Sequence, residues 1–517
     1  MMLLQLTDIA NIIRQIFSPL KDFLLAVVPP GWLMSLPSLT LVAFAFIALI
    51  VGLKYNPLGI SFIGVLLAVV EMVTLSPSDP DIVNLIGTGG VSFGQFVRDP
   101  MADFFIYIVL IVGFLVLMSS TLYGGDKGPY NFLLLISFAG ALWVVMATDL
   151  VALFLSWEVM STPTYVLVAL GPGREAIDGA TKYFVMGLLA SMLMLFGIAI
   201  VFGVTGTTNI VEVASAVQNI WTTFGTNPNA AYTILLAVVL FVVSFGFKVG
   251  IFPGWQWVPD AYASADGSVT AYLAGGSKKT GVGALMRLLV IGFIAAQTQW
   301  TFLIVAVAIL TMIIGNVLAL AQRDIMRMLA YSSIAMMGYL FIGIASATNP
   351  AINLEAYTLG VGAALFHAFA HALMKSAAFI LVWAISIKLA KRVTYDDLAG
   401  LNKRSPLAAG LLAILMLSLA GMPLTVGFWS KLMLFLSAVT AGMWWLAIIG
   451  LLNSVFSLGY YLRVLRYTYM VKAPDESRIS LPTIPLAAVV VCVIAIIGLF
   501  LFPWVVWDYA WAAVPVP

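Results

Sequence analysis

Long apolar runs, separated by short stretches that contain proline, glycine or charge, follow one another along nearly the whole chain. A helix needs roughly 20 mostly apolar residues to cross the hydrocarbon layer of a membrane. On this criterion the pattern predicts an all-α integral membrane protein with about fourteen transmembrane helices. The predicted spans are 36–53, 57–76, 102–121, 129–147, 150–170, 182–204, 231–252, 266–290, 301–321, 327–346, 358–387, 406–440, 443–465 and 481–502.

Three segments outside these spans need separate interpretations. The apolar part of residues 8–28 is short and is interrupted by Lys21 and Asp22. It is compatible with an interfacial helix, a further crossing or an uncleaved leader. The polar stretches 77–100 and 205–230 are too short for domains, and we expect loops with short interfacial helices there.

Lysine and arginine residues gather in alternate loops, which tests the span count independently. Most of them lie in loops after odd-numbered spans, whereas loops after even-numbered spans hold only Arg98 and Arg287. Because positively charged loops stay on the cytoplasmic side, the odd-numbered loops are predicted to be cytoplasmic. Both ends of the chain are then expected on the opposite face of the membrane.

The composition excludes several classes of protein. Apolar residues make up 62% of the 517 residues and charged residues only 9%, whereas soluble domains carry about 25% charged residues. A net charge of +2 does not provide the basic surface that nucleic-acid binding needs. The one cysteine, Cys492, provides no disulfide framework, thiolate metal cage or iron–sulfur ligand set. Any redox chemistry is therefore expected in a partner.

Several ionisable residues lie inside predicted spans, where charged groups are costly and rarely kept without a task. The cations are Lys248, Lys278, Lys279, Lys375 and Lys431. Glu158 is the acid that lies most clearly at membrane depth, and Glu71 is a weaker second. His367 and His371 precede Lys375 at successive i, i+4 steps, which places the three side chains on one helix face.

A single lysine in a membrane helix often snorkels to the interface or neutralises a carboxylate, and Lys279 is expected to be structural or redundant beside Lys278. Five lysines, two histidines and a glutamate spread over five helices instead favour a path for protons or cations. Because removal from water disfavours the charged form of an amine, a water-linked row of lysines can take up and release protons. The histidines lack a third ligand, which disfavours a metal site.

Helix-breaking residues occur in two spans, each near one of these lysines. The seventh span contains Lys248-Val-Gly-Ile-Phe-Pro253, and the long stretch 406–440 contains Gly421-Met-Pro423 ahead of Lys431. Non-helical backbone at membrane depth must be buried in protein or line a water-filled cavity. Broken helices five spans apart predict two inverted five-helix repeats, each with one broken helix. The expected units are N-terminal helices at 1–125, a first repeat at 126–292, a second repeat at 297–470 and a C-terminal span at 471–517.

A set of motifs stands in a characteristic order between Asp99 and Arg466. They are Ser-Trp-Glu158; Lys248-Val-Gly-Ile-Phe-Pro253 with Trp257-Val-Pro-Asp260; Ser277-Lys278; Gln322-Arg-Asp324 with Leu-Ala-Tyr331-Ser-Ser; His371-Ala-Leu-Met-Lys375; and Ser418-Leu-Ala-Gly-Met-Pro423 with Gly427-Phe. In these motifs the chain resembles the antiporter-like proton-pumping subunits of respiratory complex I and its relatives. That family is shared with Mrp-type cation/proton antiporters and membrane-bound hydrogenases.

Within the family, some motifs resemble the N-type subunit. They are Lys182-Tyr-Phe-Val-Met-Gly, Ser277-Lys278, and Asn453-Ser454 followed by Tyr460-Tyr-Leu-Arg463. The His371-x-x-x-Lys375 element is more typical of the other antiporter-like subunits. The chain also departs from the family twice. Its usual histidine after the broken seventh helix is replaced within Pro253-Gly-Trp-Gln256-Trp257, and its Ala-Pro-Thr-Pro stretch is Ala265-Asp-Gly-Ser268 here.

The resemblance implies a role for each buried group. Glu158 and Lys248 would form the input-side pair, Lys278 with the His371 and Lys375 region the central relay, and Lys431 the output-side group. It also implies that this chain holds no cofactor. Flavin, iron–sulfur clusters and a quinone-type acceptor would belong to partner subunits, which include other antiporter-like subunits. The expected setting is the plasma membrane of a prokaryote or another energy-transducing membrane.

These inferences predict a proton-translocating subunit of a redox-driven NADH:quinone oxidoreductase-type complex, or of an archaeal relative that depends on deazaflavin or ferredoxin. Two alternatives stay open. One is a subunit of an Mrp-type sodium/proton antiporter without a redox partner, and the other is a non-conducting membrane scaffold whose lysines only hold helices together.

Overall fold

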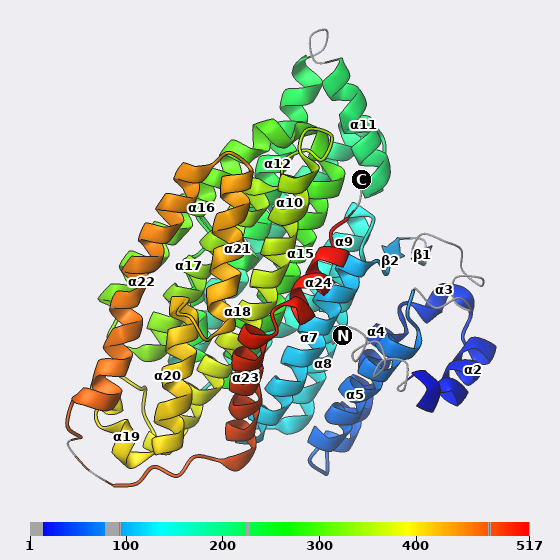
Figure 1. Ribbon diagram of the computed structural model, residues 1–517. Helices are drawn as coiled ribbons and strands as arrows, with labels where there is room; N and C mark the ends of the chain where they lie inside the picture. Colours follow the sequence, from blue (N-terminus) through cyan, green and yellow to red (C-terminus); the bar gives the residue numbers. More distant parts are fainter. Residues whose placement is uncertain are drawn as a thin grey trace.

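The computed structural model describes residues 14–77, 92–93, 95–223, 228–473, 475 and 477–515. Long helices lie side by side in a bundle, with shorter helices near its two ends and along one side (Figure 1). Strands β1 (Ser92–Phe93) and β2 (Phe96–Val97) form a small antiparallel pair. The helices are α2 (Ser18–Val27), α3 (Pro30–Leu33), α4 (Leu36–Gly52), α5 (Leu58–Thr74), α7 (Pro100–Ser119), α8 (Lys127–Met146), α9 (Leu150–Ala169), α10 (Arg174–Thr205), α11 (Ile210–Thr222), α12 (Pro228–Val249), α13 (Trp257–Ser264), α14 (Gly267–Tyr272), α15 (Lys278–Arg287), α16 (Gln297–Ala321), α17 (Ile325–Ser346), α18 (Leu354–Leu389), α19 (Leu401–Arg404), α20 (Pro406–Ala420), α21 (Val426–Thr440), α22 (Trp444–Met470), α23 (Thr483–Leu501) and α24 (Trp504–Ala512).

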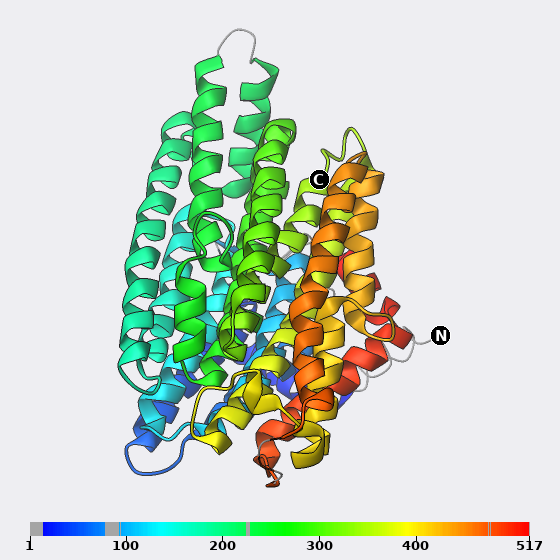
Figure 2. The ribbon, with the colours of Figure 1, turned by 90° about the vertical axis from the view of Figure 1, so that its left-hand side faces the viewer.

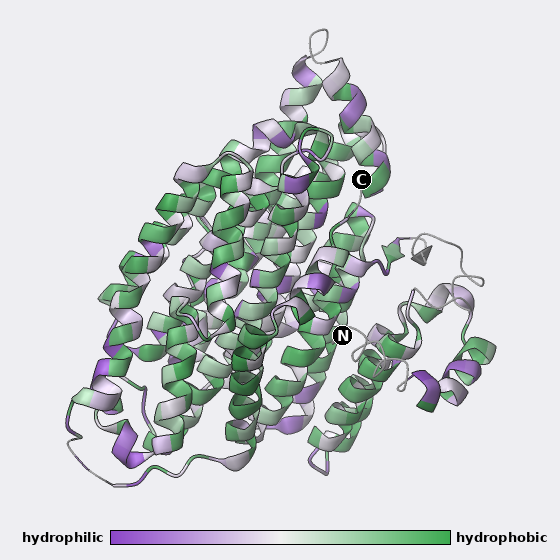
Figure 3. Cartoon of the chain, viewed as in Figure 1, coloured by the Kyte–Doolittle hydropathy of each residue, from purple (hydrophilic) through white to green (hydrophobic). Residues whose placement is uncertain are grey.

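Ten helices in the described part of the chain are long and apolar enough to cross a membrane, by length and composition. Four shorter apolar helices, α4, α5, α20 and α21, fall within the predicted spans 36–53, 57–76 and 406–440. Figure 3 shows apolar residues along the middle of the bundle and many of the polar residues at its ends. The all-α membrane fold is thus confirmed, while the exact number of crossings stays a prediction.

The most buried helices lie at the centre of the bundle. In α17, 94% of the apolar stretch is buried, against 39% in α10 and 44% in α22. α10 and α22 lie apart, with the central helices between them (Figures 1 and 2). Their outer surfaces expose large apolar side chains such as Leu188 and Phe456. A membrane removes the need to hide such side chains, because lipid tails are as apolar as they are.

Both predicted helix breaks are confirmed. Residues 250–256 separate α12 from α13, and residues 421–425 separate α20 from α21. Gly250 and Gly421 begin the two breaks with φ angles of 71° and 88°. Glycine tolerates such angles because it has no Cβ. The helix therefore ends at these positions without backbone strain.

Neighbouring helices satisfy backbone groups that the first break sets free. Thr311 Oγ1 in α16 accepts a hydrogen bond from the amide of Phe252 at 3.0 Å. Trp257 Nε1 donates to the carbonyl of Phe247 at 2.8 Å. Such partners are needed because an unpaired backbone group costs several kcal/mol in a membrane. The inverted symmetry of the repeats and the boundaries of the four units stay predictions.

The predicted span at 266–290 is not one regular α-helix. A π-helical turn at Leu273–Ser277 joins α14 to α15, and a second follows α15 at Leu288–Gly292. A π turn contains an extra residue and so rotates the helix that follows it relative to a regular α-helix. The consecutive residues Lys278 and Lys279 come directly after the first π turn, and both are buried.

The polar and N-terminal segments are described in part. α2 occupies residues within 8–28, while residues 8–13 lie outside the described part, so the nature of this segment stays open. α11 is a short helix in the stretch 205–230, as expected. Most of the stretch 77–100 also lies outside the described residues.

Candidate functional site

The two lysines at the start of α15 point toward different helices. The side-chain nitrogen of Lys278 lies 3.3 Å from Oγ of Ser333 in α17 and 5.2 Å from the centre of the Tyr262 ring. Lys279 Nζ instead lies 2.6 Å from Nδ1 of His371 in α18. Lys279 rather than Lys278 therefore contacts the histidine, while its expected structural or redundant role stays a prediction. Consecutive residues of an α-helix point in directions about 100° apart, so the two lysines meet different neighbours.

The two histidines of α18 continue from this contact toward α21. The His371 and His367 rings are nearly parallel, with centroids 6.0 Å apart. His367 Nδ1 lies 3.2 Å from Oγ of Ser430, the residue before Lys431, and Nε2 lies 3.2 Å from the Met336 carbonyl. His371 Nε2 is buried without a hydrogen-bond partner in the described residues. Buried polar groups of this kind are commonly satisfied by water.

Lys375 lies one turn further along α18 and faces another helix. It is fully buried, and its Nζ donates to Oγ of Ser332 at 2.7 Å and to the carbonyl of Leu329 at 2.9 Å. The Ser332 hydroxyl in turn contacts the hydroxyl of Tyr461 in α22. The predicted stripe of His367, His371 and Lys375 is therefore present, but its members contact different neighbours.

A buried amide network lies between Lys375 and Lys431. Asn316 Oδ1 in α16 accepts a hydrogen bond from the Tyr460 hydroxyl at 2.9 Å. The amide nitrogen of Asn316 donates to Tyr339 at 3.3 Å and to Oδ1 of Asn453 at 3.2 Å. Tyr460 packs on the ring of Tyr461, with centroids 4.4 Å apart. The network thus joins α16, α17 and α22 within the membrane region.

Lys431 lies at the second helix break. Its Nζ donates to the carbonyl of Ala420, the last residue of α20, and to Oγ of Ser454, both at 2.9 Å. It also lies 4.9 Å from the centre of the Tyr339 ring. The last carbonyls of a helix lack intrahelical partners and carry partial negative charge, so a cation is favoured there. The break therefore creates the binding environment of this lysine.

Lys248 lies at the end of α12 and is held by hydroxyl groups. Its Nζ donates to Tyr183 at 2.5 Å and to Oγ1 of Thr164 at 3.3 Å. The centres of the Tyr183 and Tyr165 rings are 5.0 and 5.7 Å away, so both rings offer a cation–π contact. These groups come from α9 and α10, two neighbours of α12.

The expected contact between Glu158 and Lys248 is not a direct ion pair. Glu158 is half-buried in α9, and its Oε1 accepts a hydrogen bond from Ser191 of α10 at 2.5 Å. Among the described residues, no carboxylate oxygen lies within 4.0 Å of Lys248 Nζ. Two tyrosines and a threonine, rather than the acid, contact the lysine directly.

The first break links Lys248 to Lys278. A Cβ added at Gly250 would lie 3.2 Å from Lys278 Nζ and 2.7 Å from a methyl group of Val258. The open helix end after Lys248 therefore packs directly against the next lysine. This close approach requires glycine for reasons of space as well as conformation.

An acid in α13 joins the first half of the chain to the second. Asp260 accepts from Lys182 of α10 at 2.5 Å and from Arg327 of α17 at 2.8 Å. The motifs around Asp260 and Arg327 thus form one ion-paired cluster, at the end of the bundle that the charge pattern predicts to be cytoplasmic.

Charged residues near the other end have structural partners. Arg98 is buried, contacts Asp103 at 2.6 Å and donates to two carbonyls in α5 and just after it. Arg287 pairs with Asp99 at 2.7 Å. Glu71 accepts from Thr40 at 2.8 Å within α4 and α5, far along the chain from the lysines. We assign these groups no part in the path.

Several residues that contact the lysines or join their neighbours were missed in the sequence. Tyr183 and Asn453 lie in motifs that indicated only the family type, and Thr164 and Ser332 are common helix residues. Asn316 is a lone amide in an apolar helix, a signal that indicates helix packing as readily as function. Their roles depend on contacts between helices far apart in sequence.

Residues 147–457 match the family model described as NADH:quinone oxidoreductase/Mrp antiporter, TM. F(420)H(2) dehydrogenase subunit N of Methanosarcina mazei is 35% identical over 486 residues, which cover 90% of this chain and 95% of the relative. NADH-quinone oxidoreductase subunit N of Trichlorobacter lovleyi is 36% identical, over 79% of this chain and 84% of the relative. A chain of the membrane-bound sulfane sulfur reductase, an archaeal respiratory membrane complex, is similar in structure with a TM-score of 0.79. It is 26% identical, and the match covers 94% of this chain and 96% of that chain.

Proposed function

Because this chain belongs to the transmembrane family of NADH:quinone oxidoreductases and Mrp antiporters, we propose that it is an N-type proton-translocating subunit of a redox-driven membrane complex. Two relatives named subunit N match it over most of its length. The complex is of the NADH:quinone oxidoreductase type, or an archaeal relative that depends on deazaflavin or ferredoxin. Flavin, iron–sulfur clusters and a quinone-type acceptor belong to partner subunits, among them other antiporter-like subunits. It resides in a prokaryotic plasma membrane or another energy-transducing membrane, with both chain ends on the non-cytoplasmic side.

One observation carries this proposal: buried ionisable groups extend from one broken helix to the other. Lys248 precedes the first break, and Lys278 lies against it. Lys279 contacts His371, and Lys431 occupies the second break. A structural lysine in a membrane commonly pairs with an acid, whereas none of these lysines has a carboxylate oxygen within 4.0 Å of its Nζ among the described residues.

Protons pass along this row in a fixed order of groups. They enter at Glu158 and Lys248, move to Lys278, and reach the central groups Lys279, His371 and Lys375. They leave from Lys431. Water between the broken helices completes the steps that side chains do not bridge, since free amines and imidazoles exchange protons through water.

Electrostatic repulsion drives each transfer. Two positive charges a few ångströms apart in a low-dielectric interior disfavour each other strongly. Protonating one member therefore favours proton release from the next. Tyr183 and Thr164 hold Lys248 in place, and a shift of Glu158 toward or away from it sets whether the lysine keeps its proton. Changes in partner subunits supply that shift.

Co-purification separates a redox complex from an Mrp-type antiporter. The native membrane is extracted with a mild detergent, and everything that migrates with this chain is identified by mass spectrometry. We expect iron–sulfur subunits together with other antiporter-like subunits. Recovery with small membrane subunits alone would contradict the redox role and indicate the sodium/proton antiporter.

A substitution separates the proton path from a scaffold. Lys248→Ala should leave the assembled complex intact and impair proton pumping. Among the described residues the lysine has no carboxylate oxygen within 4.0 Å, so its loss leaves no buried acid unpaired. Lys54→Ala, at an exposed loop position, is the matched control and should pump normally. Normal pumping by Lys248→Ala would support the scaffold.

A further inference from the structure

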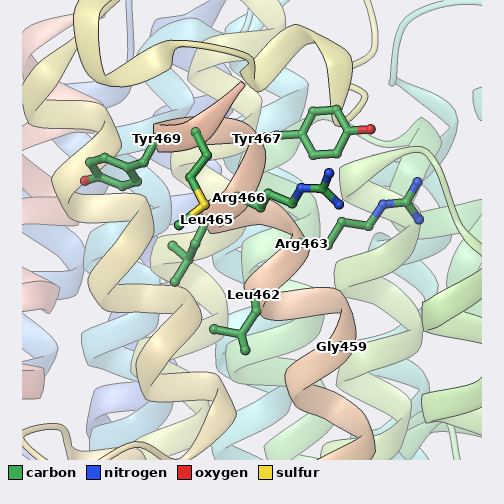
Figure 4. A pocket seen from close by; sticks show the side chains of 8 residues that line it. Gly459, Leu462, Arg463, Leu465, Arg466, Tyr467 and Tyr469 are labelled. Carbon is green, nitrogen blue, oxygen red and sulfur yellow. The ribbon is translucent and has the colours of Figure 1, made fainter. Parts of the chain in front are cut away.

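The last turns of α22 form a groove at the surface of the bundle. It has a volume of about 880 Å³. Leu462, Arg463, Arg466, Tyr469 and Met470 are among its lining residues (Figure 4). Leu462 and Tyr469 are nearly half exposed, and Met470 is 81% exposed. The groove therefore combines two cations with open apolar side chains.

The two arginines lie three residues apart on one side of the helix. Figure 4 shows both guanidinium groups extending in the same direction from α22. Like charges at this spacing repel each other on a helix. Among the described residues, neither arginine has a carboxylate oxygen within 4.0 Å of its nitrogens. An anion between the two guanidinium groups would remove the repulsion.

The aromatic neighbour of Arg463 does not neutralise it. The guanidinium carbon lies 4.2 Å from the centre of the Tyr395 ring. Burial raises the pKa of Tyr395 to about 12, so its phenol is neutral at physiological pH. The ring offers a cation–π contact and leaves the positive charge uncompensated.

Some cations at this end of the bundle have acidic partners. Lys391 pairs with Asp397 at 2.5 Å, and Arg392 contacts Glu175. For Arg463 and Arg466, by contrast, the positive charge has no acidic partner among the described residues. It points to an occupant that carries negative charge.

The groove lies where lipid headgroups are expected. The positive-inside pattern assigns this end of α22 to the cytoplasmic side. Leu451, Leu452, Val455 and Phe456 extend along α22 from the groove toward the other face, and each is more than half exposed. Tyrosines such as Tyr469 are typical of the level where headgroups meet hydrocarbon. Basic pockets at this level bind anionic headgroups.

We propose that this groove binds an anionic phospholipid of the cytoplasmic leaflet. The lipid phosphate bridges Arg463 and Arg466, because guanidinium groups bind phosphate through paired hydrogen bonds. An acyl chain lies along Leu462 and the apolar residues below it. This inference rests on the membrane setting and does not depend on which ion the chain translocates.

The test compares lipid retention by the intact complex. The complex is extracted into nanodiscs of phosphatidylglycerol or phosphatidylcholine, and bound lipids are counted by native mass spectrometry. We expect the double variant Arg463→Gln/Arg466→Gln to bind phosphatidylglycerol at least about tenfold more weakly than the wild type. Arg463→Lys/Arg466→Lys, which keeps the charge but loses paired hydrogen bonds, should give an intermediate loss.

A charge-matched variant provides the control. Arg174→Gln/Arg323→Gln removes two exposed positive charges at the same predicted end and should change binding less than about twofold. An equal loss in this control would overturn the proposal. Equal retention of phosphatidylcholine, or displacement of the lipid by millimolar inorganic phosphate, would also overturn it.

Two further measurements separate lipid binding from misfolding and from a contact with another subunit. Thermal unfolding midpoints in phosphatidylcholine should be the same for all variants, so that a binding loss does not reflect misfolding. A photoreactive side chain at Met470 should label lipid in the native complex. Labelling of another subunit instead would show that this face is a protein interface and would contradict the proposal.

Discussion

The side-chain nitrogen of Lys279 lies 2.6 Å from Nδ1 of His371, between α15 and α18. At this distance one group must donate and the other accept, so the pair holds one proton in the contact. A second proton on the pair would place two positive charges in direct contact. The contact therefore couples the charge of α15 to the histidines of α18.

Replacing Lys279 should impair proton pumping. Lys279→Met keeps the length of the side chain but leaves Nδ1 of His371 without its partner. Losing a charged hydrogen bond in the interior costs about 1.5–3 kcal/mol, which corresponds to roughly a tenfold to hundredfold loss of rate if it acts on the transfer step. Proton uptake by reconstituted vesicles measures the effect.

The same substitution at the neighbouring lysine, Lys278→Met, is the comparison variant. If Lys279 were redundant beside Lys278, Lys279→Met would pump at the wild-type rate while Lys278→Met would not. That result would contradict the coupling role of the Lys279 contact.

The two connections from the central groups to Lys431 should be separable by a double-mutant cycle. His367→Leu removes the contact to Ser430, and Asn316→Leu removes the amide that joins Tyr460, Tyr339 and Asn453. We expect each single variant to retain part of the pumping rate and the double variant to lose nearly all of it. The free-energy cost of the double variant should then exceed the sum of the two single costs. Strictly additive costs would contradict two alternative connections to Lys431.

Gly250→Ala should reduce pumping without abolishing assembly. The φ of 71° costs an L-residue about 1–2 kcal/mol, and the new Cβ would lie 3.2 Å from Lys278 Nζ. Gly203→Ala in α10 is the matched control, since its Cβ would meet no atom within 4 Å. The control should be neutral or slightly stabilising. Equal pumping by both variants would contradict the role of the first break.

Loss of the Asp260 cluster should destabilise the junction between the two halves. Asp260→Asn removes the acid that pairs with Lys182 and Arg327. Because these partners are partly exposed, we expect a modest loss of about 1 kcal/mol in the free energy of unfolding. Glu175→Gln, which removes the exposed contact to Arg392, should cost less. Thermal unfolding of the extracted complex measures both, and a larger loss for Glu175→Gln would contradict this ranking.

Local signals in the sequence predicted the helices and their breaks. Hydrophobic length determines a membrane helix, and the glycines and prolines near Lys248 and Lys431 mark the breaks directly. The structure also places Lys248, Lys278, Lys375 and Lys431 in buried positions, as expected.

Local signals in the sequence could not predict the contacts among these groups. The contact of Lys279 with His371 joins residues 92 positions apart, so a local helical period cannot show it. Asn316 and Tyr461 contact residues more than a hundred positions away. The separation of Glu158 from Lys248 likewise depends on how α9 and α10 pack beside α12.

We propose that the buried lysines carry protons during electron transfer. The most direct measurement is electron-transfer-driven proton uptake by vesicles that contain the purified complex, with Lys278→Met compared with the wild type. We expect the Lys278→Met complex to assemble and to take up clearly fewer protons per electron transferred than the wild type. An assembled Lys278→Met complex with unchanged uptake per electron would contradict it.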